Sequence, residues 1–199
     1  MILALTGGPG SGKSTFARLL GQRHAFQVFD ADACVHQLLA EDADVIAKVA
    51  AAFGEEVLDR PSQVSRPALR KIVFADAGAR RRLESILHPA VRARWQQMRS
   101  DCQTAGQDFL ADIPLLFETG GEVHFDAVIV VAASLQTQRR RLTARGLDAA
   151  TVDALLASQL PMSDKVVRAT AVIWSDGTEA ALGRQADLLI ERLTSARHA

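Results

Sequence analysis

The chain has 199 residues, which suits one domain with a small lid or insert. Its 23 Lys and Arg residues balance 23 Asp and Glu residues, so no basic excess points to nucleic acid or an anionic membrane as a partner. Apolar runs stay below the ~18 residues that span a bilayer. The first strand lacks the basic flank of a signal peptide, and two isolated cysteines fit a reduced compartment, so we expect a cytoplasmic protein.

The first predicted elements are an apolar strand over residues 2–6 and a helix that starts near Thr15. Between them, residues 7–15 read GGPGSGKST, a complete Walker A pattern that we term the phosphate-binding loop. Its glycines let successive N–H groups point at phosphate oxygens, and the helix adds its positive dipole end. A glycine-rich turn that binds nothing is the alternative, and the flanking strand and helix argue against it. We expect ATP to bind at Gly10, Ser11, Gly12, Lys13, Ser14 and Thr15, with Lys13 on the phosphates in a catalytic role and Ser14 as a ligand of Mg²⁺.

A second predicted strand, residues 26–29, leads into Asp30 and Asp32. If the strand geometry continues, both carboxylates lie on one face, at the strand end where ligands bind in open α/β sheets. A carboxylate there can accept or orient the proton of an attacking hydroxyl. An Asp at such a turn also commonly caps the following helix. We favour the cap for Asp30 and the catalytic role for Asp32.

The stretch from 41 to 104 is helical by pattern and is predicted to be an insert that binds the second substrate. Pro61 and Pro67 flank a loop within it, and helices are expected at about 67–75 and 79–87. Pro89 is expected at the first position of a long helix that reaches residue 104. His88 then either caps this helix or faces an anionic ligand together with Arg92, one turn further on.

A third predicted strand, residues 109–113, is apolar except for Asp112. Asp is rarely buried without a partner, so Asp112 either contributes to a Mg²⁺ site or accepts hydrogen bonds from the backbone. The run Pro114, Leu115, Leu116, Phe117 and Glu118 follows the strand end and is a candidate wall of a substrate pocket. By residue type alone, packing is the better explanation for its apolar side chains.

The clearest strand, residues 127–132, is β-branched and apolar throughout, as expected for a central parallel strand. Helices are predicted at 135–145, 148–160 and 163–169. Arg141 and Arg145 are one helical turn apart and suit a lid that closes on phosphates. Arg139 and Arg140 are more easily explained as solvated residues.

A last strand at 171–174 and a last helix at 178–196 complete the pattern. Strands that alternate with helices predict a three-layer α/β fold of the P-loop NTPase type with a five-stranded parallel sheet. We expect one domain over residues 1–199, with a core at about 1–40, 105–134 and 170–199. The helical insert occupies 41–104, and the lid occupies 135–169.

Taken together, these motifs resemble the dephospho-CoA kinase family over nearly the whole chain. The matching segments are GGPGSGKST at 7–15, DAD at 30–32, ALR at 68–70, HP at 88–89, DIPLLFE at 112–118, QRRRLTAR at 138–145 and the stretch from Gln159 to Gly177. The phosphate-binding loop is common to many families, whereas the ordered set DAD, HP and PLLFE is far more specific. The chain departs from the family pattern at Gly146, Ser158 and Trp174.

The resemblance implies ATP-dependent phosphorylation of the ribose 3′-hydroxyl of dephospho-CoA by a cytoplasmic enzyme that is a monomer or a small homo-oligomer. Asp32 corresponds to the catalytic base of the family, and Arg141 to a lid arginine that contacts ATP phosphates. The insert with Arg70 and His88, and the segment from Pro114 to Phe117, would contact dephospho-CoA. From the residues alone, a different P-loop small-molecule kinase and a nucleotide-dependent switch remain alternatives.

Overall fold

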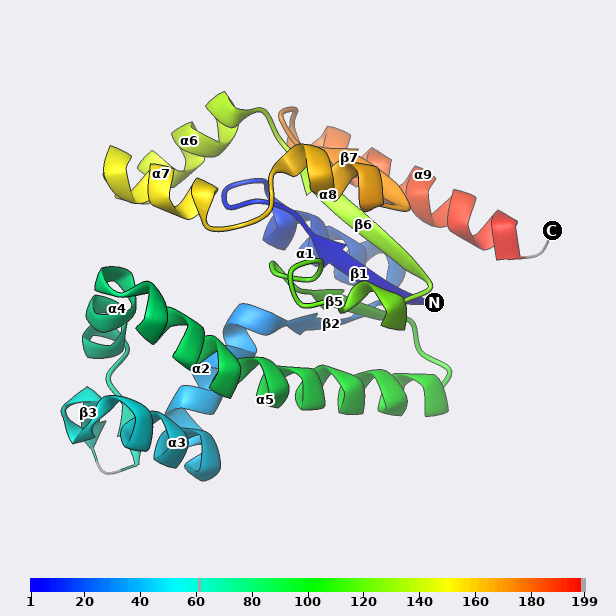
Figure 1. The fold of residues 1–199 in the computed structure, drawn as a ribbon. Helices are drawn as coiled ribbons and strands as arrows, with labels where there is room; N and C mark the ends of the chain where they lie inside the picture. Colours follow the sequence, from blue (N-terminus) through cyan, green and yellow to red (C-terminus); the bar gives the residue numbers. More distant parts are fainter. Residues whose placement is uncertain (61, 198–199) are drawn as a thin grey trace. The chain divides into compact units, whose positions relative to one another are not determined.

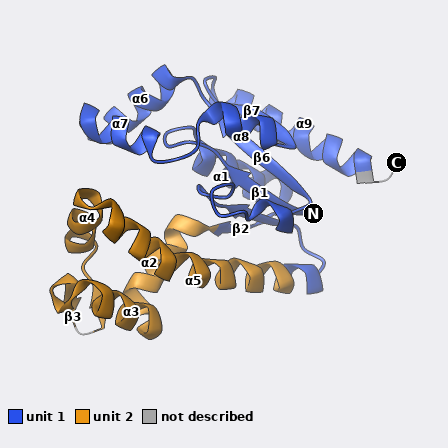
Figure 2. Cartoon of the chain, in the orientation of Figure 1, with its two compact units in different colours: residues 1–29, 102–199 blue, residues 30–101 orange. Residues whose placement is uncertain are grey.

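The computed structural model describes residues 1–60 and 62–197, so Pro61 and residues 198–199 lie outside the described residues. The chain forms two compact units (Figure 2): residues 1–29 with 102–199, and residues 30–101. Helix α2 (Ala31–Glu41), most of which we assigned to the core from the sequence, therefore belongs to the second unit. The three helices expected to form the lid are part of the first unit.

The first unit is built around a parallel sheet, and the predicted five strands are confirmed in the described part of the chain. Their order is β2-β5-β1-β6-β7, with β1 paired in parallel to both β5 and β6. Every residue of β1, β5 and β6 is buried, as expected for strands covered on both faces. The strands are β1 (Ile2–Thr6), β2 (Gln27–Asp30), β5 (Phe109–Asp112), β6 (Ala127–Ala132) and β7 (Ala171–Trp174).

Helices cover both faces of this sheet. Figure 1 shows α1 (Lys13–His24) behind the strands and α8 (Met162–Arg168) in front of them. Helix α9 (Glu179–Arg197) packs against α1 and β7. The core between α1 and the sheet includes Leu5, Phe16, Leu20 and Ile129, all fully buried, and each such side chain contributes ~1.5–3 kcal/mol. This core fixes the start of α1 relative to the ends of the strands.

Strand β7 lies at the edge of the sheet, and its last residue is held by α9. The amide N–H of Trp174 donates to the Gln185 carboxamide oxygen (3.0 Å), and the Gln185 amide group donates back to the Trp174 carbonyl (2.9 Å). The indole remains 52% exposed, so Trp174 is not a core residue. Gln185 therefore occupies the two backbone groups of Trp174 that an edge strand leaves open.

The second unit is mainly helical. It contains α2, α3 (Ala43–Phe53), α4 (Arg66–Ala75) and most of α5 (Ala77–Thr104). The expectation that this stretch is entirely helical is wrong, because a short 3-10 helix, η1 (Glu55–Val57), leads into an antiparallel hairpin of β3 (Leu58–Arg60) and β4 (Gln63–Val64). Strands of two or three residues are too short to show an alternating pattern in the sequence.

Pro89 lies inside α5 and does not start a helix, which corrects our prediction of two helices separated near His88. Leu87, Val91 and Trp95, spaced four residues apart, are buried on one face that continues through the proline. Pro89 itself is exposed, so the hydrogen bond that it cannot make is lost on the solvent side. The continuous buried stripe therefore keeps the helix intact.

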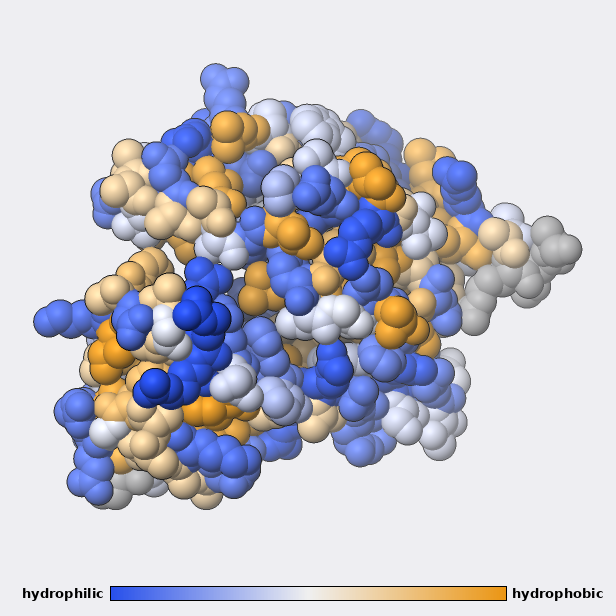
Figure 3. Space-filling view, in the orientation of Figure 1, coloured by the Kyte–Doolittle hydropathy of each residue, from blue (hydrophilic) through white to orange (hydrophobic). Residues whose placement is uncertain are grey.

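The surface of the described residues is mixed in character. On the face seen in Figure 3, hydrophobic side chains form small groups separated by hydrophilic ones. Within residues 1–60 and 62–197, we find no helix whose length and hydropathy would let it traverse a lipid bilayer.

Candidate phosphate-binding site

The phosphate-binding loop joins β1 to α1, as the sequence predicts, and two of its glycines are required by their surroundings. Gly7 has φ 150°, and a Cβ atom there would lie 2.3 Å from the Val131 carbonyl oxygen. Gly10 has φ 70°, and its Cβ would lie 2.9 Å from the Gln138 carbonyl oxygen. The loop is therefore packed between the end of β6 and helix α6 (Leu135–Thr143), with no room for side chains at these positions.

Lys13 and Ser14 begin helix α1. The Lys13 ammonium donates to the Gly8 carbonyl (3.3 Å), so its side chain folds back over the loop. Ser14 is exposed, and Thr15 lines a cavity beside the loop. Since the free N–H groups of a helix start point along its axis, this end of α1 is suited to an anion.

Arg141 on α6 is tied to the loop instead of facing solvent. Its Nη1 atom donates to the Gly10 carbonyl (3.1 Å) and to the Ser175 hydroxyl (2.9 Å), and its Nη2 atom donates to the Ser175 carbonyl (2.5 Å). The Ser175 hydroxyl in turn donates to the Ser11 carbonyl. A network of side chain and backbone groups thus joins α6, the segment after β7 and the loop.

A cavity of about 440 Å³ opens beside the loop, within the ~300–1,000 Å³ range of small-molecule pockets. Arg145 lines it together with Arg141, although α6 ends at Thr143, two residues earlier than predicted. The two arginines are therefore not on one helical face, yet they line the same cavity. Its other lining residues are Gly12, Thr15, Ala144, Ser175, Gly177, Thr178, Glu179 and Leu182.

The start of α6 is held by the segment after β7. Ser134 caps the helix by accepting from the Thr137 amide (3.2 Å), and its own N–H donates to Asp176 (3.0 Å). Hydrogen bonding from Ser134 lowers the pKa of the Asp176 carboxyl, which favours its ionised form. Arg139, which we expected to be simply solvated, forms an ion pair with Asp153 of α7 (Ala149–Ala157) at 2.5 Å.

Asp112 is the last residue of β5 and is 6% exposed. It pairs in register with Leu5, two residues before the phosphate-binding loop begins, so its carboxylate belongs to the same end of the sheet as the loop. Just beyond it, the Pro114 carbonyl accepts a hydrogen bond from the Thr6 hydroxyl (3.1 Å). The segment after β5 is thereby attached to the entry of the loop.

The apolar residues of that segment divide into two kinds. Leu116 and Phe117 are buried, at 0% and 5% exposure, and Arg168 of α8 lies over the Phe117 ring at 4.3 Å from its centroid. Pro114 and Leu115 are half-buried. Packing therefore explains Leu116 and Phe117, whereas Pro114 and Leu115 keep surface that a ligand can contact.

In the second unit, Asp30 is the N-cap of α2 and accepts from the Ala33 amide (2.9 Å), as predicted. Asp32 lies in the first turn of α2, and it is exposed. Because the strand stops at Asp30, the two carboxylates do not share a strand face, and that expectation is wrong. A helix start follows the strand end directly, and its free N–H groups favour an acidic residue such as Asp32.

The remaining predicted substrate residues also lie in the second unit. Arg70 of α4 stacks on Phe74 at 5.1 Å and, with His36 and Arg66, lines a cavity of about 640 Å³. His88 and Arg92 are partly buried, one turn apart within α5, and His88 caps no helix.

Sequence reasoning included Glu118 only as the end of the candidate pocket wall, and Lys165, Ser175 and Asp176 only within the stretch that resembles the family. It gave none of the four a role of its own. Ser175 and Asp176 follow the end of β7, and the rule that ligands gather at strand ends was the signal that could have found them. A lysine in a seven-residue helix gives no such signal, because most lysines are solvated.

Comparison with known proteins places this geometry in a family. A family model described as "CoaE: Dephospho-CoA kinase" matches residues 1–181. Two curated relatives, both named dephospho-CoA kinase, come from Anaeromyxobacter dehalogenans and Rhodopseudomonas palustris. The first is 44% identical over 98% of this chain and 93% of its own length, and the second is 44% identical over 89% and 88%.

Solved structures agree. The crystal structure of TT1252 from Thermus thermophilus has a TM-score of 0.79 at 32% identity, covering 97% of both chains. A dephospho-CoA kinase from Campylobacter jejuni has a TM-score of 0.72 at 25% identity, covering 98% of both chains. A shikimate kinase from Acinetobacter baumannii, at 15% identity and a TM-score of 0.53 over 98% of this chain and 94% of its own, shows the shared fold alone.

Proposed function

Because the chain belongs to the dephospho-CoA kinase family, we infer that it transfers the γ-phosphoryl group of ATP to the ribose 3′-hydroxyl of dephospho-CoA. This is the last step of coenzyme A synthesis. The observation that carries the inference is the family match over residues 1–181, which includes the phosphate-binding loop and its sterically required glycines.

The ATP phosphates bind along Gly10 to Thr15, where the amides of the loop and of the α1 start converge. The 440 Å³ cavity beside Gly12 and Thr15 supports the placement of the rest of the nucleotide there. Lys13 swings from the Gly8 carbonyl to the β- and γ-phosphates, an exchange of one weak hydrogen bond for a charge-assisted one.

The donor set near the loop fits Mg²⁺ only when the nucleotide shares in binding it. In the described ranges 1–60 and 62–197, no group of three or more His, Cys, Asp and Glu side chains is arranged to hold a metal ion. The Ser14 hydroxyl and the Asp112 carboxylate are hard oxygen donors, and Mg²⁺ commonly uses one or two protein oxygens together with phosphate oxygens and water. When bound, the ion would neutralise charge on the transferring phosphates.

Asp32 accepts or orients the proton of the acceptor hydroxyl. Its carboxylate is exposed in the first turn of α2, directly after the carboxyl end of β2, and it is therefore accessible to a substrate. Arg70, His88 and Arg92 of the same unit bind dephospho-CoA, for which their donor groups and positive charge are suited, since the acceptor carries phosphates. Pro114 and Leu115 provide apolar contact.

The arginines of the lid act on the nucleotide. Arg145 is exposed and unrestrained by a helix, so it can close on the transferring phosphoryl group. Arg141 brings its positive charge beside Gly10, and a small rotation redirects one of its Nη atoms to a phosphate. Closure of α6 and α7 excludes water and limits hydrolysis of ATP.

The experiment is a coupled kinase assay with dephospho-CoA, run beside a panel of nucleoside, nucleotide and sugar-acid acceptors. We expect turnover with dephospho-CoA alone, and a product that carries a 3′-phosphate. Lys13→Ala serves as the inactive control. Preferential turnover of another acceptor would indicate a different small-molecule kinase, and ATP consumption that needs no acceptor would indicate a nucleotide-dependent switch.

A cytoplasmic location and a state of monomer or small homo-oligomer are part of the same proposal. Light scattering of the purified chain measures the oligomeric state directly, and cell fractionation tests the location.

A further inference from the structure

Lys165 of α8 is a fully buried cation with all of its donors used. Its side chain is 0% exposed, and its Nζ atom lies 2.9 Å from the Pro114 carbonyl and 3.0 Å from Gln159 Oε1. A third acceptor, Glu118 Oε1, lies at 3.0 Å. An ammonium group has three N–H donors, so these three acceptors match its capacity.

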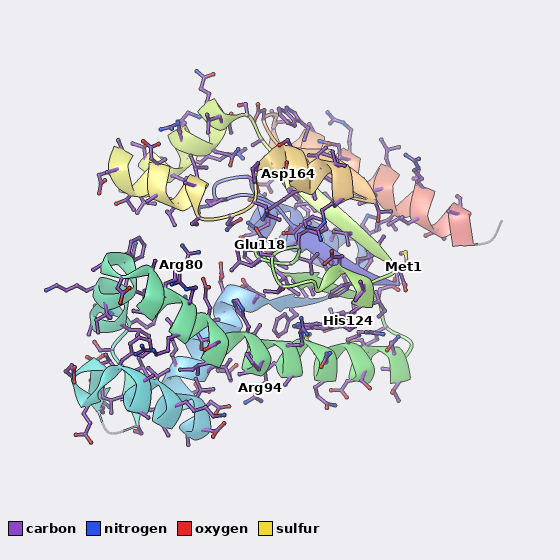
Figure 4. The ribbon with its side chains drawn as sticks, viewed as in Figure 1. Met1, Arg80, Arg94, Glu118, His124 and Asp164 are labelled. Atoms are coloured by element: carbon purple, nitrogen blue, oxygen red, sulfur yellow. The ribbon has the colours of Figure 1, made fainter. Side chains whose placement is uncertain are left out.

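The acceptors come from two separate segments of the first unit. Pro114 and Glu118 are the two ends of the segment after β5, and Glu118 is labelled in Figure 4. Gln159 belongs to the connection between α7 and α8, and the neighbouring Leu160 amide donates to the same Glu118 oxygen (2.9 Å). Lys165 and Glu118 therefore clamp the segment after β5 to the connection between α7 and α8.

The clamp also reaches the phosphate-binding loop. The Pro114 carbonyl accepts from both Lys165 and the Thr6 hydroxyl, and Thr6 is the residue directly before the loop. Thr6 is itself fully buried, so this junction is shielded from solvent. One carbonyl oxygen thus connects the entry of the loop to the segment 114–118 and to the lid.

Stability alone does not account for a buried lysine. Burial lowers the pKa of Lys165, and the hydrogen bond and charge of Glu118 counteract part of this effect. A buried ion pair is often no more stabilising than apolar side chains of the same size, because desolvation of the charges offsets their attraction. A buried ammonium group whose hydrogen bonds are all satisfied instead contributes rigidity, because it holds its three acceptors at defined positions.

We propose that Lys165 is a positioning residue for the phosphoryl acceptor, which it serves by holding the segment 114–118 against the connection between α7 and α8 and against the entry of the phosphate-binding loop. The proposal rests on the proposed function, since the segment is assigned there to dephospho-CoA. It deepens that function by naming the groups that fix the apolar wall of the acceptor site. Lys165 contacts neither substrate; it acts through Pro114 and Glu118.

The test compares Lys165→Met, Glu118→Ala and Glu118→Gln with the wild-type chain, with both substrates varied. We expect the acceptor kcat/KM to fall ~10–100-fold in the first two variants, because small displacements of a positioning group have effects of this size. The KM for ATP should change less than about threefold, because the proposed role concerns the acceptor. A general loosening of the structure would instead change the KM values of both substrates. Glu118→Gln keeps the acceptor oxygen and should stay within about threefold of wild type.

Hydrogen exchange gives a readout independent of turnover. The Leu160 amide donates to Glu118, so it should exchange at least about tenfold faster in Glu118→Ala and retain protection in Glu118→Gln. Arg23→Met is the matched control, because it removes a cation that also joins two helices of this unit, through Asp187, and should leave the acceptor kcat/KM unchanged. Glu118→Ala leaves Lys165 two of its three acceptors, the Pro114 carbonyl and Gln159 Oε1. This variant therefore tests the proposal even if Lys165→Met does not fold.

Two results would overturn the proposal. One is an acceptor kcat/KM for Glu118→Ala that stays within about threefold of wild type, and the other is an equal change in the KM values of both substrates in the variants. A wild-type chain that is inactive toward dephospho-CoA gives a different result, since it refutes the proposed function. The two failures are separated by the wild-type turnover measured in the same assay.

Discussion

Arg141 and Ser175 are joined by two hydrogen bonds, from Nη1 to the hydroxyl at 2.9 Å and from Nη2 to the carbonyl at 2.5 Å. The same guanidinium donates to Gly10, and the same hydroxyl donates to Ser11. The shape of the phosphate-binding loop therefore depends on one side chain from α6 and one from the segment after β7. A serine far from the loop in sequence is part of its support.

Replacement of Ser175 by alanine should loosen this support. The variant loses the hydrogen bonds to Arg141 and Ser11, and hydrogen bonds to charged groups are worth ~1.5–3 kcal/mol, so the KM for ATP should rise about tenfold. Steady-state kinetics at saturating acceptor measures it. Ser195→Ala, which removes a hydroxyl bonded to Glu191 on the exposed surface of α9, is the control. An unchanged KM for ATP in Ser175→Ala would show that the network does not shape the nucleotide site.

Two glycines with nearly the same φ angle allow the steric effect of an added Cβ atom to be measured. Gly10 has φ 70° and Gly106 has φ 67°, but a Cβ atom at Gly106 meets nothing within 4 Å, whereas one at Gly10 meets the Gln138 carbonyl at 2.9 Å. Alanine at either position should cost ~1–2 kcal/mol for the left-handed backbone. Gly10→Ala should cost a further ~1–3 kcal/mol for overpacking. Urea unfolding of both variants gives the difference, and equal losses would mean that the contact at Gly10 relaxes freely.

The role of Asp32 is tested by replacing its carboxylate with the neutral carboxamide of asparagine. Asp32→Asn should lower turnover by ~10²–10⁴, the usual contribution of a positioned acid or base, while ATP binding is retained. Asp30→Asn is the matched control, because Asn caps a helix as well as Asp does, and it should keep turnover within about threefold of wild type. If Asp32→Asn retains more than about a third of wild-type turnover, Asp32 is not the base.

The pH dependence of stability should carry a contribution from Asp42, which caps α3. The backbone N–H of Val45, at 3.1 Å, lowers the pKa of Asp42, and Arg94 (Figure 4) adds to this at 3.0 Å. A carboxyl whose pKa is lower in the folded state stabilises the fold above its unfolded pKa of ~3.9, and the contribution is lost as pH falls through the folded value.

Asp42→Asn isolates this contribution, because it keeps the cap but not the charge. Its deficit in unfolding free energy should be below ~1 kcal/mol near neutral pH, as expected for a partly exposed pair, and should disappear as the pH is lowered past the folded pKa. Urea unfolding of both proteins across this pH range measures it. A deficit that stays constant with pH would assign the effect to the cap geometry.

The sheet was predictable because its inner strands are continuous apolar runs, a signal that needs no knowledge of neighbours. The phosphate-binding loop and the cap at Asp30 were predictable for a similar reason, since each depends on a few adjacent residues. The hairpin of β3 and β4 was not, because its strands are too short for a pattern. Pro89 was misleading, because the rule for prolines at helix starts ignores a buried stripe that continues past it.

The contacts around the candidate site were the least predictable part. The Arg141 network and the Lys165 clamp each join segments that are distant in the sequence, and no local pattern encodes which arginine or lysine finds buried acceptors. Arg145 shows the same limit at short range. Its distance from Arg141 suggested one helical face, but the helix ends between them, and only the fold brings both to one cavity.

The carboxamide of Gln185, which matches both backbone groups of Trp174, has a consequence for solubility. A half-exposed tryptophan on an edge strand is a site where a strand of another chain can pair with the sheet. Such pairing at sheet edges leads to aggregation. An incoming strand here must first displace a side-chain amide that imitates a neighbouring peptide group. Gln185 thus protects the β7 edge of the sheet against strand addition at Trp174.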